Sequence, residues 1–132
     1  MAEEVAQTYV MDASAVLALL QGEPGGERVA RTLPGSIIST VNLAEVHGKV
    51  ARSQRDPRHV GSLLVSGGLE VEPFSEVDAE AAGAMEPSTR KLGLSLGGRA
   101  CLALAERLGR PILTADRALA KAAWSVSVEL IR

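Results

Sequence analysis

Twice in this chain a short run of strand-forming residues ends in an aspartate and leads directly into a helical segment. The two patterns are residues 8–11, Asp12 and residues 15–20, then residues 111–114, Asp116 and residues 117–123. If both strands are parallel, both carboxylates reach the same edge of the sheet, where open α/β folds bind their ligands. Taken singly, Asp12, or Ser14 beside it, is better explained as a helix cap, and so is Asp116 before the later helix. The repetition of the pattern favours a site.

The rest of the chain alternates between strand-like and helix-like segments. Further strands are expected at residues 36–39, 69–73 and 126–130, the second of them at a sheet edge, and further helices at 27–33, 41–55, 57–66, 76–86 and 96–108, with a loop at 90–93. Strands separated by helices imply right-handed crossovers and parallel pairing. The sequence therefore predicts one α/β domain over residues 1–132. Its sheet should be open, mainly parallel and four- to five-stranded, with helices on both faces.

A third acid is placed by the helix expected at residues 41–55. Thr40 is the expected cap of this helix, and Val41, Ala44 and Gly48 are expected to share one of its faces. Glu45 then lies in the first turns, where it can face the same sheet edge as the two aspartates. Three carboxylates without matching cations repel one another unless a divalent ion neutralises them. Mg²⁺, with Mn²⁺ as a substitute, suits such all-oxygen ligands.

Composition narrows the alternatives. Aromatic residues make up 2% of the chain and the formal net charge is −2, which argues against a base-stacking platform and a general electrostatic nucleic-acid binder. The single cysteine, Cys101, has apolar neighbours and is expected to be buried. His47 and His59 lack partners at metal-binding spacing and are expected at the surface. The segment with Glu3 and Glu4 is unlike a secretory signal, and no apolar run could span a membrane, so a cytoplasmic protein is expected.

Four segments together resemble one family. They are Val10-Met11-Asp12-Ala13-Ser14-Ala15, Asn42-Leu43-Ala44-Glu45-Val46, Gly93-Leu94-Ser95-Leu96-Gly97-Gly98-Arg99-Ala100-Cys101-Leu102-Ala103-Leu104-Ala105 and Leu113-Thr114-Ala115-Asp116-Arg117. In this order and spacing they resemble the PIN-domain ribonucleases, and most of all the VapC toxins of bacterial toxin–antitoxin pairs. The resemblance extends over residues 8–130.

The resemblance implies roles for particular residues. The acids Asp12, Glu45 and Asp116 correspond to catalytic, metal-binding positions, and Thr114, with Ser14, to supporting hydroxyls. The family pattern has a further acid where this chain has Gly98, which puts full metal affinity and activity in question. The basic residues nearest these positions are the expected RNA contacts: Arg99, Arg117, Arg90 and Lys91.

The expected function is that of a Mg²⁺-dependent endoribonuclease toxin that hydrolyses RNA phosphodiesters, weakened or inactive because of Gly98. The resemblance also implies a homodimer and a cognate VapB-type antitoxin that occludes the site. One alternative is a catalytically silent PIN fold that only binds RNA or an antitoxin. A second is a phosphoacceptor domain of the response-regulator type, but the last predicted strand ends at residues 129–132 without the lysine expected there.

Overall fold

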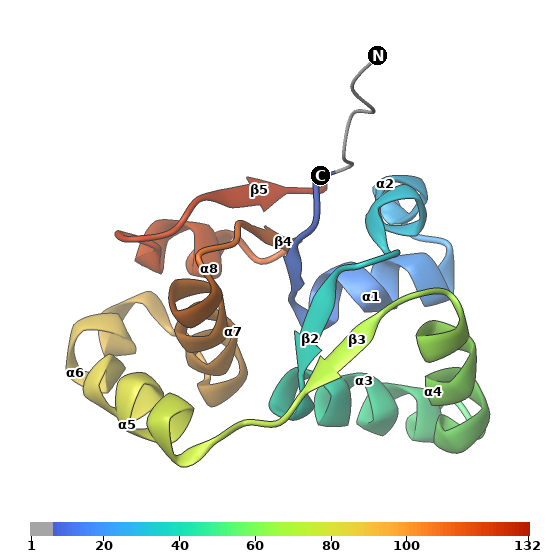
Figure 1. Ribbon diagram of the computed structural model, residues 1–132, viewed down its shortest axis with the longest axis horizontal. Coiled ribbons are helices and arrows are strands. Elements are labelled where there is room, and N and C mark those ends of the chain that lie inside the picture. Colours follow the sequence, from blue (N-terminus) through green and yellow to red (C-terminus); the bar gives the residue numbers. More distant parts are fainter. Residues whose placement is uncertain (1–6) are drawn as a thin grey trace.

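The computed structural model describes residues 7–132, which form a five-stranded sheet with all strands parallel (Figure 1). In chain order the strands are β1 (Val10–Met11), β2 (Ile37–Ser39), β3 (Glu70–Glu72), β4 (Ile112–Thr114) and β5 (Val128–Leu130). Their order across the sheet is β3-β2-β1-β4-β5, so β3 lies at an edge as predicted. The predicted α/β class is confirmed. The segment with Glu3 and Glu4 lies outside the described residues.

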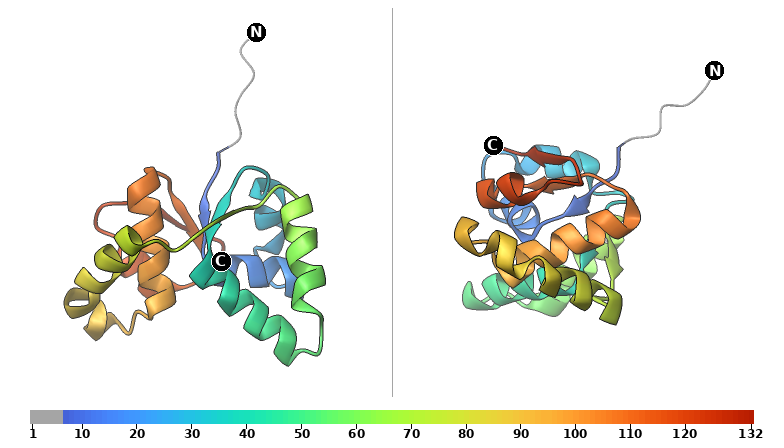
Figure 2. Two further views of the ribbon diagram at one scale, coloured as in Figure 1. Left: turned by 60° about the horizontal axis from the view of Figure 1, so that its bottom comes forward. Right: turned by 90° about the vertical axis from the view of Figure 1, so that its left-hand side faces the viewer.

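Helices cover both faces of the sheet. They are α1 (Ala13–Gln21), α2 (Gly26–Thr32), α3 (Thr40–Arg52), α4 (Pro57–Ser66), α5 (Glu76–Ala84), α6 (Glu86–Thr89), the 3-10 helix η1 (Arg90–Leu92), α7 (Leu96–Leu108) and α8 (Arg117–Ala122). Figures 1 and 2 show α1, α3 and α4 on one side of the strands and α5, α6 and α7 on the other. Within residues 7–132 no helix is both long and apolar enough to cross a membrane.

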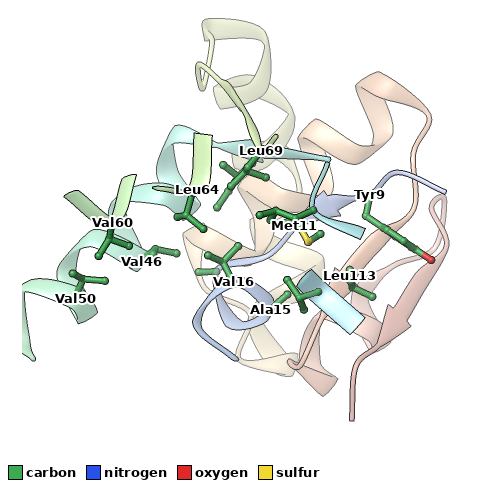
Figure 3. Packing of buried hydrophobic residues seen from close by; sticks show 14 residues of the cluster. Tyr9, Met11, Ala15, Val16, Val46, Val50, Val60, Leu64, Leu69 and Leu113 are labelled. Atoms are coloured by element: carbon green, nitrogen blue, oxygen red, sulfur yellow. The ribbon is translucent and has the colours of Figure 1, made fainter. Parts of the chain in front are cut away.

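Two apolar cores follow from the alternation of side chains along the strands. Met11, Ile38 and Leu113 point to the side of α1, α3 and α4, where Figure 3 shows Met11 and Val16 between the α4 side chains and Leu113. Their neighbours in the strands, Val10, Ile37 and Ile112, point to the opposite side, against α7 and α8. Residues 100–105 of α7 are all buried there, Cys101 among them, as their uniformly apolar sequence predicts. Because the middle strands are apolar on both faces, polar groups of a site can only lie beyond the carboxyl ends of these strands.

The strand order sets the location of a binding site. The chain builds β1, β2 and β3 outward in one direction, then returns to place β4 on the other side of β1. A crevice forms where the order reverses, outside the carboxyl ends of β1 and β4. The observed order also differs from the 2-1-3-4-5 order of response regulators, which removes the phosphoacceptor alternative.

Four local predictions need correction. Ser39, not Thr40, caps α3, because its hydroxyl accepts a hydrogen bond from the Val41 amide at 3.2 Å while Thr40 is already helical. The buried face of α3 consists of Asn42, Val46 and Val50 rather than of Val41, Ala44 and Gly48. The segment expected to be a loop contains a 3-10 turn, Arg90–Leu92. His59 is exposed as expected, whereas His47 is half-buried.

A buried acid joins α5 to α7 and provides a stability test. Asp78 forms a capping box with Ser75 at the start of α5 and receives two hydrogen bonds from the Arg107 guanidinium, at 2.8 and 3.1 Å. Hydrogen bonding from Arg107 holds the pKa of Asp78 below its usual value, against the opposing effect of burial. The stabilisation is therefore present above the aspartate pKa of the unfolded chain, about 4. It is lost as the pH falls through the lower pKa of the folded state.

We therefore expect Asp78→Asn to lower the free energy of unfolding by about 1–3 kcal/mol at neutral pH. The effect should stay below that of a fully buried ion pair, because the Arg107 side chain is 33% exposed. Urea unfolding at pH 7 and at pH 3 measures it, with the exposed Glu76→Gln on the same helix as the control. An equal loss at both pH values would contradict the assigned role of the ionised carboxylate.

Candidate functional site

A cavity of about 370 Å³ opens at the carboxyl ends of β1 and β4. It is lined by Asp12, Ala13, Ser14, Leu17, Glu45, Lys49, Ser95, Gly98 and Asp116. All three acids singled out in the sequence therefore line one cavity, although they come from three separate parts of the chain. A larger hollow of about 710 Å³ lies at the junction of α1 and α2, but it holds none of the three acids.

Asp12 is held by two hydroxyl groups. Its Oδ2 accepts hydrogen bonds from the Ser14 hydroxyl at 2.6 Å and from the Thr114 hydroxyl at 2.7 Å, and the residue is only 7% exposed. The backbone N–H of Ala115 donates to Ser14 Oγ, and that of Asp116 donates to Thr114 Oγ1, both at 2.9 Å. Hydrogen bonds in such a chain polarise and strengthen one another. The network fixes the orientation of Asp12 and ties the end of β1 to the end of β4.

Asp116 is both a helix cap and an acid of the cavity, the two roles between which the sequence left a choice. It is the N-cap of α8, because its Oδ1 accepts a hydrogen bond from the Ala118 amide at 2.9 Å, and it also lines the cavity. Asp12 occupies the equivalent position before α1, but its side chain makes no capping hydrogen bond there. The carboxylate of Asp12 is thus directed to the hydroxyl pair rather than to the helix.

The side chain of Glu45 extends from α3 to the start of α7. The Asn42 amide donates to Glu45 Oε1 at 3.0 Å and to the Gly97 carbonyl at 2.9 Å. Gly97 is required for this approach, since a Cβ at that position would lie only 2.3 Å from the Glu45 carboxylate. Desolvation raises the pKa of Glu45, Asp12 and Asp116 raise it further, and the Asn42 hydrogen bond partly opposes them. The folded protein therefore disfavours the ionised form of Glu45, and this charge lowers the stability of the fold.

The donor set fits a hard divalent cation. Within residues 7–132 each acid gives one oxygen to a protein hydrogen bond, while Asp12 Oδ1, Glu45 Oε2 and Asp116 Oδ2 accept none. No three acidic, histidine or cysteine side chains in the same residues are close enough to enclose a metal ion directly. Mg²⁺ usually keeps several waters and is bound through only one or two carboxylates, so direct enclosure is not required.

Comparison with known proteins identifies the fold. Residues 9–125 match the family model described as PIN domain. This chain belongs to the PIN-domain family. No curated protein matches it significantly. The PIN-domain resemblance seen in the sequence is therefore confirmed.

Solved structures share this PIN fold over nearly their whole length. A toxin–antitoxin complex from Klebsiella pneumoniae has a TM-score of 0.72 at 17% identity, covering 95% of this chain and 98% of that one. DNA-bound VapBC from Salmonella typhimurium has a TM-score of 0.71 at 15% identity, with coverages of 96% and 99%. VapBC2 from Rickettsia felis, bound to a promoter DNA fragment, has a TM-score of 0.70 at 18% identity, covering 94% of this chain and 98% of that one. At these identities the likeness establishes the fold alone.

At Gly98, where a further acid is expected from the family pattern, the space for a side chain is taken by Leu94. Gly98 is buried in the first turn of α7, where its amide donates to the capping Ser95 hydroxyl at 3.3 Å. A Cβ on Gly98 would lie 2.3 Å from Cδ1 and 2.8 Å from Cγ of Leu94. Leu94 is itself buried, so it occupies the space that any side chain at position 98 would need.

None of the four predicted RNA-contacting residues of this PIN domain lines the cavity. Arg99 is directed toward α5, where its Nη1 donates to the Ala82 carbonyl at 3.0 Å. Arg90 pairs with Glu86, while Lys91 and Arg117 are exposed elsewhere. Their contact with RNA stays a prediction.

Two residues of the site were missed in the sequence. Lys49 lines the cavity, and Asn42 positions Glu45. Both stand at helical spacing from Glu45, one turn after it and one turn before it. This i+4 and i−3 spacing from Glu45 could have identified them, because residues so spaced lie on the same side of a helix.

The raised pKa of Glu45 predicts that this PIN domain gains stability when the charge is removed. Because the folded-state pKa is raised, stability is greatest below the ordinary glutamate pKa and falls as the pH rises through the raised value. At neutral pH, Glu45→Gln should increase the free energy of unfolding by up to about 1 kcal/mol, since solvent screens the partly exposed carboxylate. Thermal melts in EDTA and in millimolar Mg²⁺ test this prediction. Equal Mg²⁺-dependent stabilisation of both proteins would contradict a ligand role for Glu45.

Proposed function

We propose that this chain is a metal-dependent endoribonuclease of the VapC toxin type, which hydrolyses RNA phosphodiesters with reduced activity because of Gly98. The observation that supports it best is the set of three acids at the reversal point of the sheet. Each of them is anchored through one oxygen and leaves the other free toward the cavity. This arrangement suits a hard cation and a phosphate better than an apolar ligand.

The acids would hold Mg²⁺, or Mn²⁺ in its place, through Asp12, Glu45 and Asp116. When bound, such an ion activates a water for in-line attack on the phosphodiester and neutralises the developing charge. Asp12 is held in one orientation by the hydroxyls of Ser14 and Thr114. Glu45 is held against Gly97 by Asn42, so a carboxylate that lines the cavity is kept in one position before a ligand binds.

The same proposal includes the partners that toxins of this type require. A VapB-type antitoxin would cover the acidic cavity, the toxin would act as a homodimer, and the RNA substrate would be met in the cytoplasm. The solved complexes described above contain antitoxins and DNA, which supports such a partnership for this fold.

A second candidate function is a catalytically silent PIN fold that binds RNA or the antitoxin without cutting. Burial of Leu94 against Gly98 favours it, because the fourth acid of the family pattern is not merely absent but replaced by packing. On this view the three remaining acids would still bind a cation or a basic partner segment.

Cleavage of a labelled single-stranded RNA separates the two functions. The purified chain is incubated with Mg²⁺, with Mn²⁺ and with EDTA, and products are resolved by length. We expect internal cuts that need a divalent ion, and faster cutting with Mn²⁺ because Mg²⁺ is stricter about its geometry. RNA binding without any cutting in Mn²⁺ would support the silent module and reject the nuclease.

A further inference from the structure

Helix α3 carries a basic stripe that begins inside the acidic cavity. Glu45, Lys49 and Arg52 are spaced i, i+4 and i+7, so they share one side of the helix next to its buried face. Lys49 lines the cavity, and Arg52 ends the helix one turn further on. With a rise of about 1.5 Å per residue, Arg52 stands roughly 10 Å along the helix from Glu45.

The stripe continues into the turn between α3 and α4. Arg55 lies in this turn and Arg58 is the second residue of α4, and all four cations, Lys49, Arg52, Arg55 and Arg58, are exposed. Among the described residues none of the four forms an ion pair, whereas Arg28, Arg90, Arg107 and Arg132 all do. The one acid between them, Asp56, is engaged in capping α4 through the Arg58 amide. Four unpaired cations on a chain whose net charge is negative are a local concentration of positive charge.

We propose that Lys49 and Arg52, continued by Arg55 and Arg58, form a backbone-binding track for single-stranded RNA that leads away from the acidic cavity. This track rests on the proposed nuclease function and names how the substrate is held. Lys49 would contact the phosphate next to the one at the acids, and Arg52 the one after it. In the acidic cavity a free phosphate is repelled, so cations beside it are needed to hold the strand in place.

The chemistry of the track favours an RNA backbone over a protein partner. The four side chains are long, exposed and all of one sign, which suits a flexible polyanion. Residues 45–58 contain no Phe, Tyr or Trp, so the track lacks the large rings of a stacking platform and would read charge rather than base identity. The predicted contacts Arg99 and Arg90, in contrast, already bond to α5 and Glu86.

Fluorescence anisotropy of a labelled single-stranded RNA tests the track. Measuring in EDTA prevents cutting, so binding is read separately from catalysis. We compare Lys49→Glu and Arg52→Glu with Arg31→Glu, which changes an exposed arginine on α2 that does not line the acidic cavity. Each track variant should weaken binding about five- to tenfold near 0.1 M salt. It should also reduce the slope of log Kd against log salt by about 0.7. The control should leave both unchanged.

Several results would overturn the track. Unchanged affinity and salt slope for Arg52→Glu, in a folded protein by circular dichroism, would reject it even if the wild-type chain cuts RNA. Loss of binding to a co-expressed antitoxin with RNA binding intact would make this surface a protein interface instead. If Lys49→Glu disturbs folding, Arg52→Gln gives the same test outside the cavity. Failure of the nuclease function would be seen separately, as no divalent-dependent cutting by the wild-type chain.

Discussion

Asp12→Asn is expected to reduce divalent-dependent RNA cleavage more than about 100-fold, because it removes the best-ordered acid of the cavity. An asparagine keeps the shape of Asp12 and can still accept the Ser14 and Thr114 hydroxyl protons, so the network around it should survive. What it loses is the negative charge and the free Oδ1 that face the cavity. Initial rates of cutting at saturating Mn²⁺ measure the effect.

Two further variants make the Asp12 result specific. Glu76→Gln changes an exposed acid in the first turn of α5, outside the cavity and the track, and should leave the rate unchanged. Ser14→Ala removes one of the two hydroxyl bonds that orient Asp12, and a roughly tenfold loss is expected. If Asp12→Asn keeps the wild-type rate while the melting temperature is also unchanged, the acidic cavity is not the site of cutting.

Gly98→Asp is expected to raise the rate of RNA cleavage at limiting Mg²⁺ about tenfold, but only where Leu94 can make room. A fourth acid strengthens the field on the cation, and tenfold corresponds to about 1.4 kcal/mol of added transition-state stabilisation. The new Cβ would collide with the Leu94 side chain, so the single variant should lose about 1–3 kcal/mol of stability through overpacking. The helix gains of replacing glycine and adding an acid near the N-terminus offset only part of that loss.

The double variant Gly98→Asp with Leu94→Ala separates charge from packing. It should cut faster than the single variant, because the carboxylate can then turn toward the cavity. Gly98→Asn in the same Leu94→Ala background has nearly the same size without the charge, and should cut no faster than Leu94→Ala alone. Equal rates for the aspartate and asparagine versions would show that the fourth charge is dispensable.

The sequence was sufficient for the features that depend on local order. A strand, an acid and a helix in succession placed Asp12 and Asp116 at one end of a parallel sheet, because crossover geometry leaves few other arrangements. The uniformly apolar run within α7 likewise predicted its central position. The edge location of β3 followed from its alternating acidic residues.

Features that depend on distant contacts could not be predicted in this way. Gly97 lies 52 positions from Glu45, and only the folded α3–α7 contact shows why a side chain is excluded there. Asn42 is a polar residue in the buried face of α3, so a search for apolar periodicity shifted that face to other residues. Arg99 looked free because nothing in the sequence shows that α5 lies next to it.

The reversal in strand order also has a consequence during synthesis. The hydroxyl network joins Asp12 and Ser14 to Thr114, so half of the site is made about 100 residues before the other half. At ordinary translation speeds of about 5–20 residues per second, this delay is of the order of 5–20 s. Before β4 is made, a nascent chain emerging from the ribosome can pair β1 only with β2 and lacks Asp116, so the cavity is not yet assembled. Under the proposed function, the chain could not cut its own message or ribosomal RNA until β4 has been made and has paired with β1.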